Sequence, residues 1–413
     1  MVENFEAKLK EYAGLLVRLG MNARPGQTVR IASPVECAAL ARACVEVCYD
    51  CGVREVIMDW NDDFVTRQKY LRADESVFSE MPSYLKAKFD YMLEKEVPVL
   101  NIIGDDPEML KGVDAKRIQT WQRTSGAALK DYYNAMTANQ FQWSIGAHPT
   151  RAWAQKVFPD VSAEEAMDKL WDAIFAACRI TGDGESARRW QEHVDTVKSR
   201  VEKLNAYAFK TLHYTNSLGT DLTIEMPENH IWGGASEESA AGVTFIANMP
   251  TEEIFSAPRY DGVNGKVYAA LPLALDGNLV KDFWMEFKDG KIVDMGAAEG
   301  VEYLRASTEI DEGSSYLGEV ALVPYDSPIR NTGILFYNTL FDENASCHLA
   351  FGSAYANCVR GGEKLDEEGQ KALGLNQSIN HVDFMVGTAD LSIVGVTPAG
   401  ERVQVFKDGN FCF

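Results

Sequence analysis

Two of the six histidines lie in one stretch, residues 341–383, and each has an acid close by. Glu343 precedes His348, and His381 is followed by Asp383 in the run HVDFMV. Side chains of an extended strand alternate between two faces, so His381 and Asp383 point the same way. An imidazole nitrogen and a carboxylate oxygen on one face can form half of a divalent-cation site. The alternative interpretation is a His–Asp hydrogen bond on the surface of a sheet.

Two further acids stand in apolar surroundings. Glu253 lies in the run NMPTEEIFSAP, and Glu319 opens the apolar run EVALVP. Burying such a carboxylate is costly unless a cation or hydrogen bonds compensate it, although either acid could also be solvated. Tyr355 ends the run LFDENASCHLAFGSAY, where it could be an ordinary packed aromatic residue. All candidates for chemistry therefore fall in the second half of the chain: Glu253, Glu319, Glu343, His348, Tyr355, His381 and Asp383.

Four runs resemble motifs of a known family. NMPTEEIFSAP, GEVALVP, LFDENASCHLAFGSAY and NHVDFMVG occur in the order found in the dinuclear metalloaminopeptidase family that includes aminopeptidase T and aminopeptidase S. The motifs cover about residues 248–390, and the resemblance extends over the whole chain. Matched residue by residue, it implies metal ligands at Glu253, Glu319, Glu343, His348, His381 and Asp383, and an active-site tyrosine at Tyr355. It also implies two divalent ions per chain and a homodimer.

The implied centre suits hydrolysis of a peptide bond. Two cations about 3.5–4 Å apart, bridged by a carboxylate and a hydroxide, supply a nucleophile at neutral pH and a Lewis acid for the carbonyl. We assign Glu319 as the bridging ligand and Tyr355 as the hydrogen-bond donor to the developing oxyanion. Glu253 or Glu343 could double as general base. One ion could also bind a free α-amine, so we predict an exo-aminopeptidase that acts on short peptides with a free N-terminus.

Other functions stay open. Zinc, cobalt, manganese and magnesium all suit oxygen-rich sites with two histidines, so the residue types do not select the metal. Another dinuclear hydrolase, for example of phosphoesters, is one alternative, although the motifs carry no evident arginine or lysine clamp for phosphate. A second alternative is a non-catalytic small-molecule binding protein. An export signal and an empty ligand set would favour that function, and the sequence has neither.

Composition limits the partners. A formal charge of −21 disfavours nucleic acid and anionic membranes, because both need a basic patch. No apolar run is long enough to span a membrane. Cys48 and Cys51 form a CxxC pair, but four cysteines from Cys37 to Cys51 share one face of a predicted helix, which favours buried apolar packing over a redox or zinc motif. With charges throughout residues 1–20 and no disulfide framework, we expect a reduced, cytoplasmic protein.

The elements that must position these residues form two domains. Predicted strands at 27–32, 54–60, 97–104 and 142–147 alternate with helical patterns, which indicates a doubly wound, mostly parallel α/β sheet. No phosphate loop or glycine fingerprint follows the first strand, so no nucleotide cofactor is predicted. Helical residues follow from 163 to 208, with a break at 181–184.

From residue 211 onward, short strands and glycine turns predict a β-rich α+β domain that carries the metal site. We therefore predict domains at 1–208 and 209–413, with hairpins at 284–293 and 403–411. His148 lies at a strand end in the first domain, where it could line a substrate cleft or be an ordinary loop residue.

Overall fold

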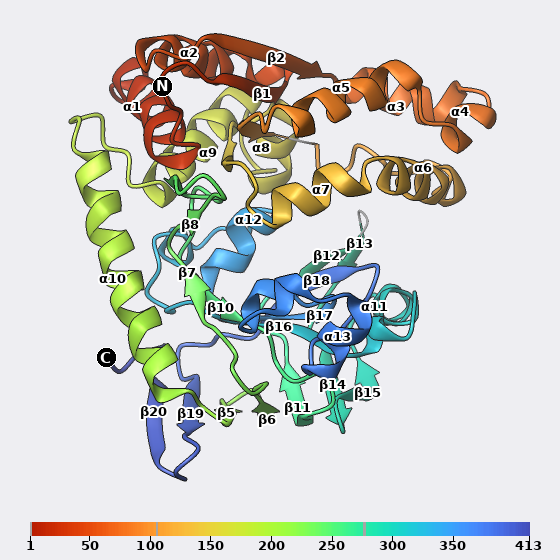
Figure 1. Ribbon diagram of the computed structural model, residues 1–413, viewed down its shortest axis with the longest axis vertical. Coiled ribbons are helices and arrows are strands. Elements are labelled where there is room, and N and C mark those ends of the chain that lie inside the picture. The colour runs from red at the N-terminus through yellow and green to blue at the C-terminus, as the bar shows by residue number, and fades with distance from the viewer. Residues whose placement is uncertain (1, 105, 276–277) are drawn as a thin grey trace. The chain divides into compact units, whose positions relative to one another are not determined.

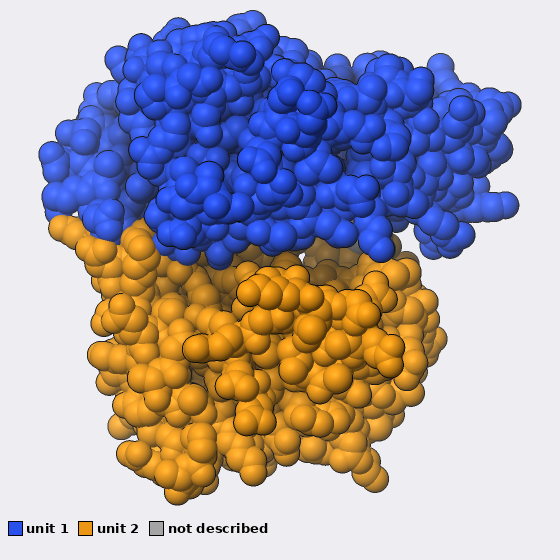
Figure 2. Space-filling model, in the orientation of Figure 1, with its two compact units in different colours: residues 1–191, 236–250 blue, residues 192–235, 251–413 orange. Residues whose placement is uncertain are grey.

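The computed structural model describes residues 2–104, 106–275 and 278–413 (Figure 1). Part of one predicted turn, at Asp276–Asn278, lies outside them. Contacts divide the chain into two compact units, residues 1–191 with 236–250 and residues 192–235 with 251–413 (Figure 2). The predicted boundary near residue 208 stays a prediction. The contact division differs from it because helix α10 (Ser186–Tyr207) contributes residues to both units.

The first unit contains a four-stranded parallel sheet. Its strands occur at the four predicted places, in the order β2-β1-β3-β4: β1 (Thr28–Pro34), β2 (Glu55–Asn61), β3 (Val99–Ile103) and β4 (Trp143–Ala147). Every adjacent pair is parallel. Helices separate these strands along the chain, as parallel connections require. The predicted parallel sheet with helices is thus present.

The helices of this unit follow the predicted patterns. They are α1 (Phe5–Leu15), α2 (Ala38–Asp50), α3 (Asp63–Arg72), α4 (Ser76–Ser79), α5 (Ser83–Glu94), α6 (Ala115–Ala128), α7 (Lys130–Thr137), α8 (Arg151–Val157) and α9 (Ala163–Ala177). On α2, Cys44 and Cys48 are fully buried. Burial raises the pKa of the Cys44 thiol, and burial together with Cys51 raises that of Cys48 to about 12. These cysteines therefore pack as small apolar side chains and not as thiolates.

The second unit is rich in antiparallel strands. Its larger sheet has the order β15-β14-β11-β6-β5-β19-β20-β21: β5 (Thr211–Thr215), β6 (Asp221–Glu225), β11 (Val263–Tyr268), β14 (Trp284–Lys288), β15 (Lys291–Gly296), β19 (Ser392–Val396), β20 (Arg402–Lys407) and β21 (Asn410–Phe411). The predicted hairpins are β14–β15 and β20–β21. Asp289 and Gly290 both have positive φ, as a two-residue hairpin turn with the right twist requires.

The smaller sheet has the order β18-β17-β16-β10-β7, with every adjacent pair antiparallel. Its strands are β7 (Gly233–Gly234), β10 (Ile254–Ser256), β16 (Leu317–Leu322), β17 (His348–Gly352) and β18 (His381–Met385). The unit also holds β12 (Leu273–Leu275), β13 (Asn278–Val280), α11 (Val301–Thr308), α12 (Thr339–Asp342) and α13 (Glu367–Ala372). One short hairpin, β8 (Glu237–Glu238) with β9 (Thr244–Phe245), belongs to the first unit.

Within the described part of the chain, none of the helices combines the length and the apolar character that a membrane crossing requires.

Candidate metal centre

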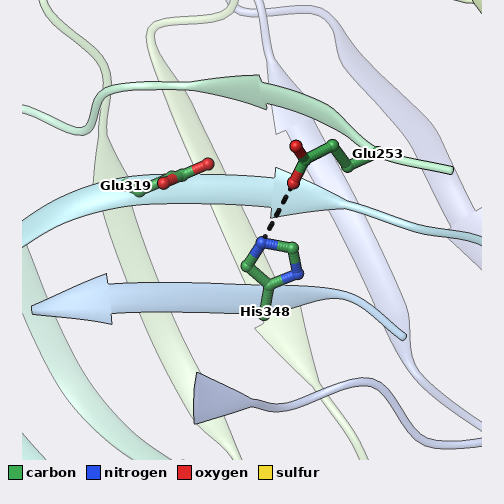
Figure 3. A group of neighbouring side chains, drawn as sticks. All are labelled: Glu253, Glu319 and His348. Atoms are coloured by element: carbon green, nitrogen blue, oxygen red, sulfur yellow. Dashed lines mark ion pairs between the residues drawn. The ribbon is translucent and has the colours of Figure 1, made fainter. Parts of the chain in front are cut away.

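The register of the five-stranded sheet brings the candidate ligands to one face. Paired residues of adjacent strands project to the same side of a sheet. Ala321 pairs with His348, and Ala350 pairs with Asp383. Glu319 lies two residues before Ala321, so its side chain shares that face. Figure 3 shows that Glu319 and His348 come from neighbouring strands and that their side chains lie close together.

The same argument extends to both edges of the site. His381 lies two residues before Asp383 and pairs with Gly352, so the predicted shared face of His381 and Asp383 is present. At the other edge, Phe255 on β10 pairs with Ala321. Glu253 lies two residues before Phe255, and its carboxylate points toward His348 (Figure 3).

Small residues leave room between these side chains. Three positions beside the candidate ligands on the same face are small, namely Ala321, Ala350 and Gly352. The opposite face is apolar, because Leu349 and Phe384 are fully buried and pair across β17 and β18. One face of these strands therefore packs in the core, and the other face carries the candidate ligands.

The ligand atoms form two overlapping groups of three. The first trio comprises Glu253, Glu319 and His348, and the second comprises Glu319, His381 and Asp383; within each, the ligand atoms lie within 4.8 Å of one another. His348 Nε2 lies 3.2 Å from Glu253 Oε2. His381 Nε2 lies 2.9 Å from Glu319 Oε2 and 3.3 Å from Asp383 Oδ1. Glu319 is the member common to both trios.

Both imidazoles are oriented by backbone carbonyls. His348 Nδ1 lies 3.3 Å from the Ser346 carbonyl oxygen, and His381 Nδ1 lies 2.7 Å from that of Ser353. A carbonyl only accepts, so each Nδ1 carries the hydrogen and donates it. Each Nε2 then faces the carboxylates, which is the arrangement that frees its lone pair for a cation.

The charge of the cluster fits divalent cations. With Glu343, four carboxylates meet two imidazoles, so protonation of both histidines would still leave two uncompensated negative charges. Burial opposes a charged imidazole at His348, but the Glu253 carboxylate and the other acids raise its pKa to about 10. Burial likewise raises the pKa of Glu319. Buried excess negative charge of this kind is relieved either by protons, as the raised pKa of Glu319 indicates, or by bound cations.

Glu343 lies close to the trios without belonging to either. It begins a 3-10 turn, Glu343–Ala345, that follows α12. Burial and the charges of Asp383 and Glu253 raise its pKa well above the usual range. The Glu343 carboxylate therefore interacts electrostatically with residues of both trios. Its role as a direct metal ligand stays a prediction.

Tyr355 lies at the edge of the cluster. Its ring centroid is 5.2 Å from that of His381 and 6.1 Å from that of Phe255, and 44 % of its surface is exposed. Burial of part of the side chain and the charges of Glu319 and Asp383 raise its pKa well above 10. The hydroxyl thus stays protonated at neutral pH and can donate a hydrogen bond.

Sequence reasoning missed the groups that orient the ligands. Ser346 and Ser353 act through backbone oxygens, which leave no side-chain signal. Asn344 is fully buried beside Glu343. It directly follows two acids, Asp342 and Glu343, so the local sequence does not mark it as a buried residue. His148 lies in the first unit, is buried at the end of β4, and contributes to neither trio.

Comparison with known proteins identifies the family of the chain. The profile of the thermophilic metalloprotease family M29 matches residues 5–411. Aminopeptidase 2 of Geobacillus stearothermophilus is 43 % identical over 412 residues, which cover 100 % of this chain and 99 % of that protein. Aminopeptidase T of Thermus aquaticus is 35 % identical, with 99 % and 100 % covered.

A solved structure, wild-type AmpT from Thermus thermophilus, superimposes with a TM-score of 0.92 at 34 % identity, over 99 % of this chain and 100 % of that one. The family resemblance of the four sequence motifs is thereby confirmed. The chain belongs to the thermophilic metalloprotease family M29 and is a metal-dependent aminopeptidase.

Proposed function

We propose that the enzyme is an exo-aminopeptidase that removes the N-terminal residue of short peptides at a centre for two divalent ions. The observation that carries this proposal is the pair of trios that share Glu319. A single ion would not need five donors divided in this way. A carboxylate common to two groups is the expected bridging ligand of a two-metal hydrolase.

The donors divide between the two ions. Glu253 and His348 would hold one ion, His381 and Asp383 the other, and Glu319 both. Glu343 is a further ligand on this proposal. When bound, the ions would supply a Lewis acid for the peptide carbonyl and water that ionises near neutral pH.

The chain's own groups complete the chemistry. The Tyr355 hydroxyl donates a hydrogen bond to the carbonyl oxygen as negative charge develops there. Glu343 is well placed to accept the proton of the attacking water at a carboxylate oxygen, since it stands beside both trios. Its raised pKa falls toward the range of a general base when cations enter the cluster.

A free α-amine explains cleavage at the first peptide bond. One of the two ions would bind the free α-amine of the substrate, whereas an acylated nitrogen is a poor ligand. The metals on this proposal are zinc, cobalt, manganese or magnesium, because the oxygen-rich donor set with two imidazoles accepts all four. The homodimer and the cytoplasmic location that the sequence led us to expect stay proposals.

The fold proposal is that the first unit's sheet is doubly wound. The strand order β2-β1-β3-β4 reverses direction after β2, and connections of the usual right-handed kind on the two sides of β1 would put helices on opposite faces.

Two measurements test the proposed function. Dialysis against a chelator should abolish hydrolysis of a leucyl peptide, and cobalt, zinc or manganese should restore it, with metal content followed by elemental analysis. The same peptide with an N-acetyl group should resist cleavage. Full activity without metal would refute the metal centre. Early internal fragments, or equal cleavage of the acetylated peptide, would refute the exopeptidase.

A further inference from the structure

Two of the proposed ligands are not held by the sheet. Glu319, His348, His381 and Asp383 lie on strands, where ladder hydrogen bonds fix the backbone. Glu253 and Glu343 lie outside the strands, the first just before β10 and the second on the 3-10 turn after α12. A side chain that fixes these two segments would control how well the centre is formed.

Asn344 bonds to both segments. It is fully buried, and its Oδ1 accepts the Glu252 N–H at 2.7 Å. Its Nδ2 donates to the Leu340 carbonyl at 2.9 Å, within α12. The amide orientation is unambiguous, because one partner can only donate and the other can only accept. The backbone carbonyl of Asn344 also accepts a hydrogen bond from the Ser327 hydroxyl at 3.2 Å, which connects the turn to the segment after β16.

These bonds act next to the ligands. Glu252 N belongs to the residue before Glu253, and Asn344 itself follows Glu343. We propose that Asn344 is a positioning residue that locks Glu253 and Glu343 together and so sets the affinity of the first trio for its ion. This inference rests on the proposed function.

Removing the amide should act mainly on the first trio. Without Asn344, the Glu252 N–H loses its buried partner and the segment before β10 gains freedom, so Glu253 spends less time near His348. Partners that orient metal ligands typically account for about 10–100-fold in metal affinity. The second trio lies on β16 and β18, and among the described residues no hydrogen bond joins Asn344 to it.

The test is a metal titration of stripped Asn344→Ala, with free metal buffered and bound metal counted by elemental analysis. We expect one ion per chain to bind about 10–100-fold more weakly and the other to keep its affinity. Excess metal should restore much of the lost activity, which a merely structural defect would not allow. Asn344→Leu keeps the side-chain volume and should give the same result if the alanine variant folds poorly.

A control is Asn205→Ala, at an exposed position. Asn205 also accepts a backbone N–H and donates to a carbonyl, but both belong to Trp232, which is part of neither segment that carries Glu253 or Glu343. It should bind both ions as the unaltered enzyme does. Unchanged affinity of both ions in the Asn344 variants, or equal weakening of both, would overturn the inference. Activity of the unaltered enzyme without metal would instead refute the proposed function itself, independently of Asn344.

Discussion

Two buried histidines, one in each unit, have opposite electrostatic environments. His148 is 6 % exposed and His348 is 1 % exposed, so both have lost nearly all contact with water. Burial lowers the pKa of His148 to about 4. Only backbone carbonyls favour its charged form, and they do not outweigh burial. At His348 the Glu253 carboxylate and its neighbours outweigh burial and raise the pKa to about 10.

The difference shows what sets the two buried imidazoles apart. Burial by itself keeps the ring neutral, and the Trp171 ring, whose centroid lies 4.6 Å from that of His148, carries no opposite charge. The carboxylates around His348 favour a positive charge at this site, which either a proton on the imidazole or a bound cation can supply. The contrast separates a packing histidine from a candidate metal ligand on physical grounds that residue type does not reveal.

The strongest test of the contrast removes the shared carboxylate. Glu319→Gln keeps the shape but takes the charge from both trios. We expect hydrolysis to fall on the order of 10³–10⁴-fold, the scale of losing one essential charged group. Elemental analysis should find both ions depleted, because Glu319 is the donor that both would share.

Glu252→Gln is the matched control, since Glu252 and Glu319 are each 5 % exposed. The Glu252 side chain faces His193, 3.8 Å from Nε2, and the substitution keeps the backbone N–H that Asn344 accepts. This variant should retain both ions. Metal retained in Glu319→Gln would show that the cluster's negative charge does not hold the cations.

A smaller effect is expected where a group touches the substrate but not the metals. Tyr355→Phe keeps the ring against His381 and removes only the hydroxyl. Loss of one oxyanion donor typically lowers turnover about 10²–10³-fold, with a smaller change in KM. Turnover, KM and metal content should be measured together.

Tyr260→Phe serves as control, because the ring of Tyr260 packs on Tyr316 and not on the cluster. Near-native turnover in Tyr355→Phe would make Tyr355 a packing residue. Lost metal would instead make its hydroxyl a ligand.

Local patterns predicted local structure well. The alternation in HVDFMV was enough to place His381 and Asp383 on one face, and the strand and hairpin positions followed from apolar runs and glycine turns. Such patterns act over a few residues, which a single sequence displays directly. They do not say that β10 lies beside β16, or that β16 lies beside β17. The family resemblance, not periodicity, joined Glu253 to the histidines.

Long-range contacts explain what escaped prediction. Ile145 N donates to the Ala247 carbonyl at 2.7 Å, one reason why residues 236–250 belong with the first unit. Asn344 gains its importance from Glu252, a residue 92 positions away. Neither pairing leaves a trace in local composition, because each depends on which surfaces meet after folding.

The smallest expected effect concerns His148 and the pH dependence of the first unit. An unfolded histidine has a pKa near 6.5, whereas buried His148 has one of about 4. Between these values the unfolded state binds more protons, so stability is present above the unfolded pKa and is lost as pH falls toward 4. At about 1.4 kcal/mol per pKa unit, the loss approaches about 3 kcal/mol. Hydrogen exchange of the β4 amides at pH 7, 5.5 and 4.5 would measure it locally.

His148→Gln should flatten this pH dependence, because an amide can still donate toward the Pro149 carbonyl but does not titrate. His213→Gln is the control, since His213 lies on β5, keeps 36 % of its side chain exposed and pairs with Asp221. It should leave the exchange of β4 unchanged. An equally steep acid loss in His148→Gln would mean that burial does not hold this ring neutral. The contrast with His348 would then reflect something other than its carboxylate neighbours.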